Sequence, residues 1–84
     1  MWNLHLTGPA QKDFLKLPPK ERRRVKRAFI AMEHDPFEGD VKRLKGYPTA
    51  WRRRMGSYRI IYDLYVEKRL IVVAGIVRRT STTY

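Results

Sequence analysis

The sequence predicts one small α+β domain, in which a hairpin of two helices packs on one face of a four-stranded, mostly antiparallel sheet. Residues 2–7 alternate apolar and polar side chains, the pattern of a strand with one buried face. Apolar side chains then recur at helical spacing between residues 9 and 32. Three apolar-rich runs follow, at 51–55, 58–64 and 70–77. The expected order of elements is therefore βααβββ.

The first strand, residues 2–7, should point His5 away from the core. Gly8 and Pro9 end it, and proline suits the first position of a helix because the N–H that it lacks would have no intrahelical partner there. Pro18 ends this short first helix and leads into the second.

The second helix carries an apolar stripe on one side and basic side chains on the other. The stripe consists of Val25, Ala28, Phe29 and Met32, and the basic residues are Lys20, Arg22, Arg23, Arg24, Lys26 and Arg27. We interpret the basic side as mainly solvated, with a secondary electrostatic role for which Arg23 and Arg27 are candidates. Segment 34–40 then reads as a loop, because Pro36 and Gly39 interrupt any helix or strand. Its one histidine and three acidic residues lack the spacing of a metal motif, so we expect no metal and no cofactor.

The run at 70–77 is almost continuously apolar, as expected for a strand buried in the middle of the sheet, and we expect the first strand to lie beside it. A length of 84 residues leaves room for one hydrophobic core, so residues 1–84 should form a single domain. The chain has no cysteine and no apolar stretch that could cross a bilayer, and its start does not resemble a signal peptide. We therefore expect a cytoplasmic protein without membrane contact.

Positive charge dominates the second half of the chain. The whole sequence has 19 basic and 8 acidic residues, a net charge of +11, and residues 42–84 contribute eleven basic and two acidic side chains, a net of +9. A surface that serves only solubility usually mixes both signs. The imbalance therefore indicates a protein that binds a polyanion, and RNA is the best candidate.

Residues 51–62 should form a hairpin around the two-residue turn Gly56-Ser57. This turn predicts that Arg54 stands opposite Arg59, and that Arg52, Arg54 and Arg59 share one face. Like charges in direct opposition destabilise a hairpin, whereas phosphates between them would satisfy all three guanidinium groups. The hairpin is therefore the predicted RNA grip.

Four residues near this grip have alternative placements. Arg53 falls on the core side, so it must either extend to the edge of the sheet or be shifted by a bulge. Whether Arg78 or Arg79 faces the grip depends on the number of residues that connect the last two strands. Tyr84 is either the end of a tail or a group that stacks on a base or transfers a proton.

Several segments together resemble the RelE/ParE superfamily of type II toxins. They are FLKLP at 14–18, DP at 35–36, GDVKRLKG at 39–46, WRRRMGSYRIIY at 51–62, and Arg78-Arg79 with Tyr84 at the end. The resemblance implies a βααβββ fold similar to that of microbial ribonucleases, and a cognate antitoxin. It also implies either cleavage of mRNA in the ribosomal A site, as in the RelE branch, or poisoning of DNA gyrase, as in the ParE branch.

The RelE pattern has basic residues at positions 52 and 54, arginines at 59 and 78, and a tyrosine at 84, and this sequence matches all five. The resemblance therefore favours the RelE branch and implies Arg52, Arg54, Arg59, Arg78 and Tyr84 as catalytic residues. Positions 52 and 54 are commonly lysine in the family, and arginine is effectively unable to give up a proton. A general-base role for Arg52 or Arg54 is thus not expected.

The expected function is that of a toxin that cuts ribosome-bound mRNA without a metal, by attack of the ribose 2′-OH on the adjacent 3′ phosphate. Further contacts to RNA or ribosome are expected from Lys42, Arg43, Lys45, Arg53 and Arg79, in addition to Arg23 and Arg27. The expected partners are the 70S ribosome with its A-site mRNA and an acidic antitoxin, with a heterotetramer as one expected assembly. The alternatives are a ParE-like gyrase inhibitor and an RNA- or ribosome-binding growth inhibitor without catalysis.

Overall fold

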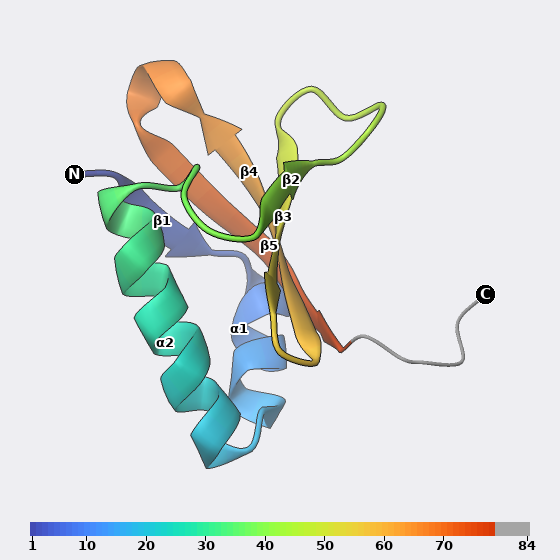
Figure 1. The fold of residues 1–84 in the computed structure, drawn as a ribbon. Coiled ribbons are helices and arrows are strands. Elements are labelled where there is room, and N and C mark those ends of the chain that lie inside the picture. Colours follow the sequence, from blue (N-terminus) through green and yellow to red (C-terminus); the bar gives the residue numbers. More distant parts are fainter. Residues whose placement is uncertain (79–84) are drawn as a thin grey trace.

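The computed structural model describes residues 1–78 and arranges them as two helices on one side of a five-stranded sheet (Figure 1). The helices are α1 (Gly8–Lys16) and α2 (Pro19–His34). The strands, in the spatial order β1-β5-β4-β3-β2, are β1 (Asn3–Leu6), β2 (Val41–Arg43), β3 (Ala50–Met55), β4 (Tyr58–Tyr65) and β5 (Leu70–Arg78). The predicted α+β class, with both helices on one face, is confirmed.

The sheet contains one strand more than the four predicted. Strand β2 pairs with β3 through three residues, Val41 to Arg53, Lys42 to Arg52 and Arg43 to Trp51. Two of its three residues are charged, so it lacks the apolar alternation by which a strand is recognised in a sequence. Its pairing with β3 makes the short, basic segment an edge strand, a position where charged side chains are common.

The first and last strands are neighbours, as predicted. Strand β1 pairs with β5 in parallel, from Asn3 with Leu70 to Leu6 with Val73, whereas β5–β4, β4–β3 and β3–β2 are antiparallel. Beyond β1, helix α1 continues along the same edge of β5. The Thr7 hydroxyl donates to Ala74 O at 3.2 Å, and Ile76 N donates to an Asp13 carboxylate oxygen at 3.0 Å. Side chains of the α1 region thus satisfy backbone groups of β5 that β1 does not reach.

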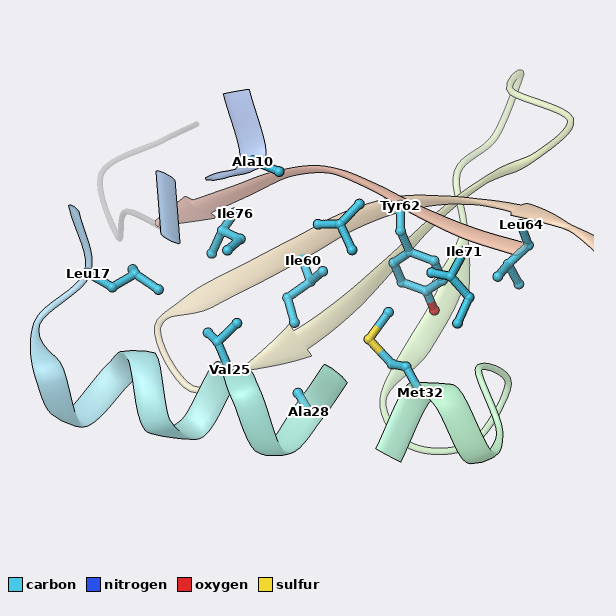
Figure 2. Close-up of a cluster of buried hydrophobic side chains, with 11 residues drawn as sticks. Ala10, Leu17, Val25, Ala28, Met32, Ile60, Tyr62, Leu64, Ile71 and Ile76 are labelled. Carbon is cyan, nitrogen blue, oxygen red and sulfur yellow. The ribbon is translucent and has the colours of Figure 1, made fainter. Parts of the chain in front are cut away.

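The hydrophobic core lies between the sheet and the helices (Figure 2). Helix α2 supplies Val25, Ala28 and Met32, and the central strands supply Ile60, Tyr62, Leu64, Ile71, Val73 and Ile76. Residues 60, 62 and 64 alternate along β4, so the intervening residues point to the sheet face that the helices leave open. We call the two sides of the sheet the covered face and the open face.

The phenol of Tyr62 is a polar group placed deep in this core. It donates a hydrogen bond to Pro36 O at 3.2 Å, and both residues are fully buried. Burial raises the pKa of the Tyr62 phenol from 10.0 to about 12, against a smaller opposing influence of Arg53 and Arg52. The neutral phenol is therefore part of the folded state over the whole neutral range.

Segment 35–40 is an ordered cover for one end of the core. The Phe37 ring packs edge to face against Trp2 and Trp51, at centroid distances of 5.9 and 5.5 Å. The backbone N–H of Phe37 donates to Asp35 Oδ1 at 3.0 Å. Among residues 1–78, no three metal-ligating side chains come together, and no helix has the length and apolar character to cross a membrane.

Candidate nucleic-acid interface

The open face of the sheet carries a group of basic side chains from three adjacent strands. Arg54 pairs with Arg59, Arg52 pairs with Ile61, and Lys42 pairs with Arg52, so the register predicted from the Gly56-Ser57 turn is confirmed. Directly paired residues share a face of the sheet. We call Lys42, Arg52, Arg54 and Arg59 the basic cluster.

Members of the basic cluster are held at unequal depth. The Arg52 side chain is 15% exposed and that of Arg54 is 40% exposed. The Nε of Arg59 is buried and has no hydrogen-bond partner among residues 1–78. Paired Cα atoms in an antiparallel sheet lie only about 4.5–5.5 Å apart, so the opposed Arg54 and Arg59 repel each other. The positive charges of the cluster would therefore be stabilised by a bound anion.

One acidic residue faces this cluster. Asp40 lies next to Val41, the first residue of β2, and its carboxylate oxygens lie 3.5 Å from Arg52 Nη1 and 3.9 Å from Arg54 Nε. Both distances exceed the roughly 2.7–2.9 Å of a strong charge-assisted hydrogen bond. A single carboxylate at these distances offsets only part of four positive charges.

Arg53 lies on the covered face, away from the basic cluster. It pairs with Ile60 without any bulge between β3 and β4, and its guanidinium donates to Glu38 O at 2.8 Å. A side chain at Gly39, which has φ +98°, would place its Cβ about 3.1 Å from this guanidinium, so the glycine leaves room for Arg53. Of the two predicted placements, extension away from the core is the one observed, and Arg53 anchors segment 35–40.

A bulge in β5 decides the face on which Arg78 stands. Pairing between β4 and β5 skips Ala74, and the extra residue reverses the alternation of faces beyond it. Arg78 consequently stands opposite Tyr58, on the side of the covered face, and is exposed at the end of the strand. The side chains of Arg78 and Arg59 therefore leave the backbone on opposite sides of the sheet. The number of residues that connect β4 to β5 was not enough to predict the face of Arg78, because the bulge adds one residue to β5.

His5 shares the open face, as predicted, but lies far from the cluster. It pairs with Val72, which pairs with Asp63, four residues along β4 from Arg59. Two strand spacings and four residue rises put His5 roughly 16 Å from Arg59. Its imidazole therefore cannot reach a phosphate held by the basic cluster.

The arrangement can bind a phosphodiester chain. Guanidinium groups are planar and always charged, and they form paired hydrogen bonds to phosphate oxygens. The contacts of Asp40 are to Nη1 of Arg52 and Nε of Arg54, and the Arg54 side chain, 40% exposed, is open to a ligand. The open face thus offers charge stabilisation and positioning, and the group beside these arginines that could accept a proton is the Asp40 carboxylate, which is ion-paired to Arg52 and Arg54.

Comparison with known proteins identifies the chain. No family model matches it. Over 81 residues it is 30% identical to a protein of Methanocaldococcus jannaschii named "Putative toxin RelE1", and the match covers 93% of this chain and 90% of that one. The chain belongs to the RelE family of toxins.

Solved RelE structures share the fold over almost the whole chain. The isolated RelE toxin of E. coli superposes with a TM-score of 0.85 at 20% identity, covering 98% of this chain and 88% of that chain. The toxin–antitoxin complex RelBE2 from Mycobacterium tuberculosis gives a TM-score of 0.82 at 26% identity, covering 93% and 98%. The family resemblance predicted from the sequence is confirmed.

The other candidate contacts of this RelE-family chain are dispersed. Arg43 donates to Pro48 O at 3.0 Å within the loop between β2 and β3, where Lys45 is exposed. Arg23 and Arg27 are exposed on α2, a helix of the covered side. Arg79 and Tyr84 lie outside the described residues.

The sequence-based site omitted Asp40, the acidic neighbour of the basic cluster in this RelE-family fold. Its only sequence signal is its distance of two residues from Lys42, which implies a shared face if the segment is a strand. Because β2 was not predicted, that signal had no structural context.

Proposed function

We propose that this RelE-family toxin is a ribosome-dependent endonuclease that cuts mRNA and thereby stops translation. In the proposed reaction the ribose 2′-OH attacks the adjacent 3′ phosphate, the bond to the next 5′ oxygen breaks, and a 2′,3′-cyclic phosphate and a free 5′-OH result. Such a reaction needs in-line positioning of the 2′-OH, stabilisation of charge on the phosphate, and proton transfer.

The observation that supports this proposal is the opposition of Arg54 and Arg59 next to Arg52 on the open face. Repulsion between directly opposed like charges costs stability, and none of these guanidinium groups supports the core. A phosphodiester chain on the open face would convert this repulsion into attraction. The cost of the cluster is thus explained by a polyanionic ligand.

Each arginine has a proposed role. Arg59 holds the scissile phosphate, because it stands directly opposite Arg54 on the open face and the positive charges there repel each other without an anion. Arg78, exposed at the end of β5, approaches that phosphate from the end of the sheet. Arg52 and Arg54 orient the flanking backbone or assist the leaving group. Tyr84 is the candidate base or stacking platform contributed by the C-terminal segment.

Dependence on the ribosome follows from the chemistry of the cluster. Arginine does not accept a proton at neutral pH, the imidazole of His5 lies roughly 16 Å away, and the Asp40 carboxylate is ion-paired to Arg52 and Arg54. Precise alignment of the 2′-OH with the leaving oxygen must then supply much of the rate. Free RNA samples this alignment rarely, whereas the ribosomal A site would hold the mRNA in a fixed conformation.

An acidic antitoxin is the proposed partner in the resting cell. RelBE2 from M. tuberculosis is a toxin–antitoxin complex with the same fold on the toxin side. A net charge of +11 favours a partner of opposite charge, and an acidic segment that folds on binding could cover the open face. Binding there would exclude RNA by direct competition.

The test is primer extension on mRNA bound to 70S ribosomes, with and without the purified protein. We expect new 5′ ends within the A-site codon, and a rate about 10²–10³-fold lower for Arg59→Ala, the usual effect of removing one charge-stabilising donor. Lys68→Ala is the matched control, since it removes one positive charge from the exposed turn between β4 and β5. It should cleave like the unmodified protein.

Two results would reject the proposal. One is cleavage that is unaffected by Arg59→Ala. The other is intact mRNA together with inhibition of DNA supercoiling by gyrase, which would instead establish the ParE-like alternative.

A further inference from the structure

Asp40 is fixed to the basic cluster by its backbone. Arg54 N donates to Asp40 O at 2.9 Å, and Val41 N donates to Gly39 O at 2.9 Å in a tight turn where Gly39 has φ +98°. The bond to Arg54 extends the β2–β3 register by one residue, so Asp40 and Lys42 both point to the open face. The position of Asp40 is therefore determined by the sheet.

The carboxylate divides its two oxygens between two arginines. Oδ1 lies 3.5 Å from Arg52 Nη1, and Oδ2 lies 3.9 Å from Arg54 Nε. The Asp40 side chain is 56% exposed, so its contacts are partly solvated, while the Arg52 side chain, 15% exposed, is held in place by its surroundings. These contacts are made through Arg52 Nη1 and Arg54 Nε, and the Arg54 side chain, 40% exposed, can also meet a phosphate.

The other acidic residue on the open face of the central strands is occupied elsewhere. Asp63 accepts a hydrogen bond from the Thr49 hydroxyl at 2.8 Å, and it lies four residues from Arg59 along β4. The positively charged neighbours of Asp40 on this face are Lys42, Arg52, Arg54 and Arg59. Asp40 is thus the acidic group placed to act on the cluster.

We propose that Asp40 is a positioning residue that orients Arg52 and Arg54 for the RNA backbone and weakens the grip of the cluster on other polyanions. This inference rests on the proposed function, which it deepens. The carboxylate holds one side of each guanidinium and leaves the opposite N–H groups directed at the ligand. Its negative charge also repels phosphates, so that binding of RNA off the ribosome is penalised.

The two effects of Asp40 predict opposite changes on its removal. Asp40→Asn keeps the shape of the side chain and removes its charge, so phosphates should bind more tightly because the repulsion has gone. Arg52 and Arg54 lose their orientation in the same variant, so each bound mRNA should be cut more slowly. A surface ion pair without function would produce neither change beyond the effect of net charge.

The binding measurement uses a fluorescent single-stranded DNA oligonucleotide, which lacks the 2′-OH and cannot be cut by the proposed chemistry. We expect Asp40→Asn to bind it about 3–10-fold more tightly than the unmodified protein, as expected from loss of about 1 kcal/mol of repulsion in a water-like medium. Glu67→Gln, in the exposed turn between β4 and β5, changes the net charge equally and is the matched control. It should change affinity less than about 2-fold, because it lies beyond the screening length from the cluster.

The cleavage measurement is a single-turnover assay on mRNA bound to ribosomes, at saturating protein. We expect Asp40→Asn to be about 5–20-fold slower than the unmodified protein, and Asp40→Glu to recover part of the rate. Equal DNA affinity of Asp40→Asn and Glu67→Gln would overturn the inference, as would unchanged cleavage by Asp40→Asn. If the unmodified protein cuts no ribosome-bound mRNA, the proposed function fails, and the DNA affinities alone then decide whether Asp40 restrains the cluster.

Discussion

The two faces of the sheet are built from alternate residues of the same strands and differ in burial and in charge. On the covered face, Ile60, Tyr62 and Leu64 of β4 are buried against the helices. On the open face, Arg59 stands opposite Arg54, and the counterion beside them is Asp40, 3.9 Å from Arg54 Nε. The covered face is satisfied within the protein, whereas the open face is not.

This difference separates stability from ligand binding at the level of single residues. A strand alternates its side chains between faces, so adjacent positions can serve opposite purposes without conflict. Burial of apolar side chains on the covered face offsets the free-energy cost of charge repulsion on the open face. Substitutions on the two faces should therefore have effects of different kinds, and often of different sign.

The largest expected contrast is between two adjacent isoleucines. Ile60 is fully buried on the covered face, whereas Ile61 is partly exposed on the open face. Ile60→Ala should lower the free energy of unfolding by about 2–5 kcal/mol, because it removes buried methyl groups and leaves a cavity. Ile61→Ala should cost clearly less, about 1 kcal/mol, since less surface is buried there. Urea unfolding measures both, and equal losses would contradict the separation of faces.

Tyr62 tests the covered face through pH. Tyr62→Phe removes the hydrogen bond to Pro36 O and should cost about 1 kcal/mol at pH 7. The phenol ionises near pH 10 in the unfolded chain, and its pKa in the folded protein is about 12. The stability contributed by the neutral phenol is therefore complete below pH 10 and is lost as the pH rises toward 12.

Unfolding curves at several pH values measure this effect. The unmodified protein should lose its advantage over Tyr62→Phe near pH 11, because one pKa unit corresponds to about 1.4 kcal/mol. A difference between the two proteins that stays constant from pH 8 to about 11 would show that burial does not hold the phenol neutral.

The smallest expected effect has the opposite sign and lies on the open face. Arg59→Met retains the apolar stem and removes both the repulsion with Arg54 and the buried Nε that lacks a partner among residues 1–78. We expect this variant to be more stable by up to about 1 kcal/mol at low salt, and the gain to shrink as salt screens the charges. Destabilisation of Arg59→Met by thermal or urea unfolding would mean that Arg59 supports the fold.

The hairpin could be predicted from sequence because its determinants are local. A two-residue turn fixes the pairing of every residue in β3 and β4, so the shared face of Arg52, Arg54 and Arg59 follows by counting. The neighbouring positions of β1 and β5 followed from the apolar character of β5. The accompanying expectation that β5 is buried on both faces was wrong: its buried residues lie on the covered face, and Val77 on the open face is 51% exposed.

What the sequence did not predict depends on contacts distant along the chain. Strand β2 exists because β3 offers it an edge, and its own residues show no strand pattern. The bulge at Ala74 is accompanied by bonds from Thr7 and to Asp13, more than sixty residues away, and no local signal marks it. The placements of Asp40 and Arg78 depend on strand β2 and on the bulge, so they could not be predicted from the sequence.

The parallel pair of β1 and β5 joins the beginning of the described chain to its end. Asn3 pairs with Leu70 and Leu6 pairs with Val73, and Ile71, Val73 and Ile76 of β5 complete the core. Pairings of such long sequence separation form late and slowly. During synthesis the emerging chain has helices and a hairpin but no partner for its first strand, so the ribosome must make nearly the whole molecule before the domain can close. A chain that ends before β5 can therefore neither pair β1 nor complete the core.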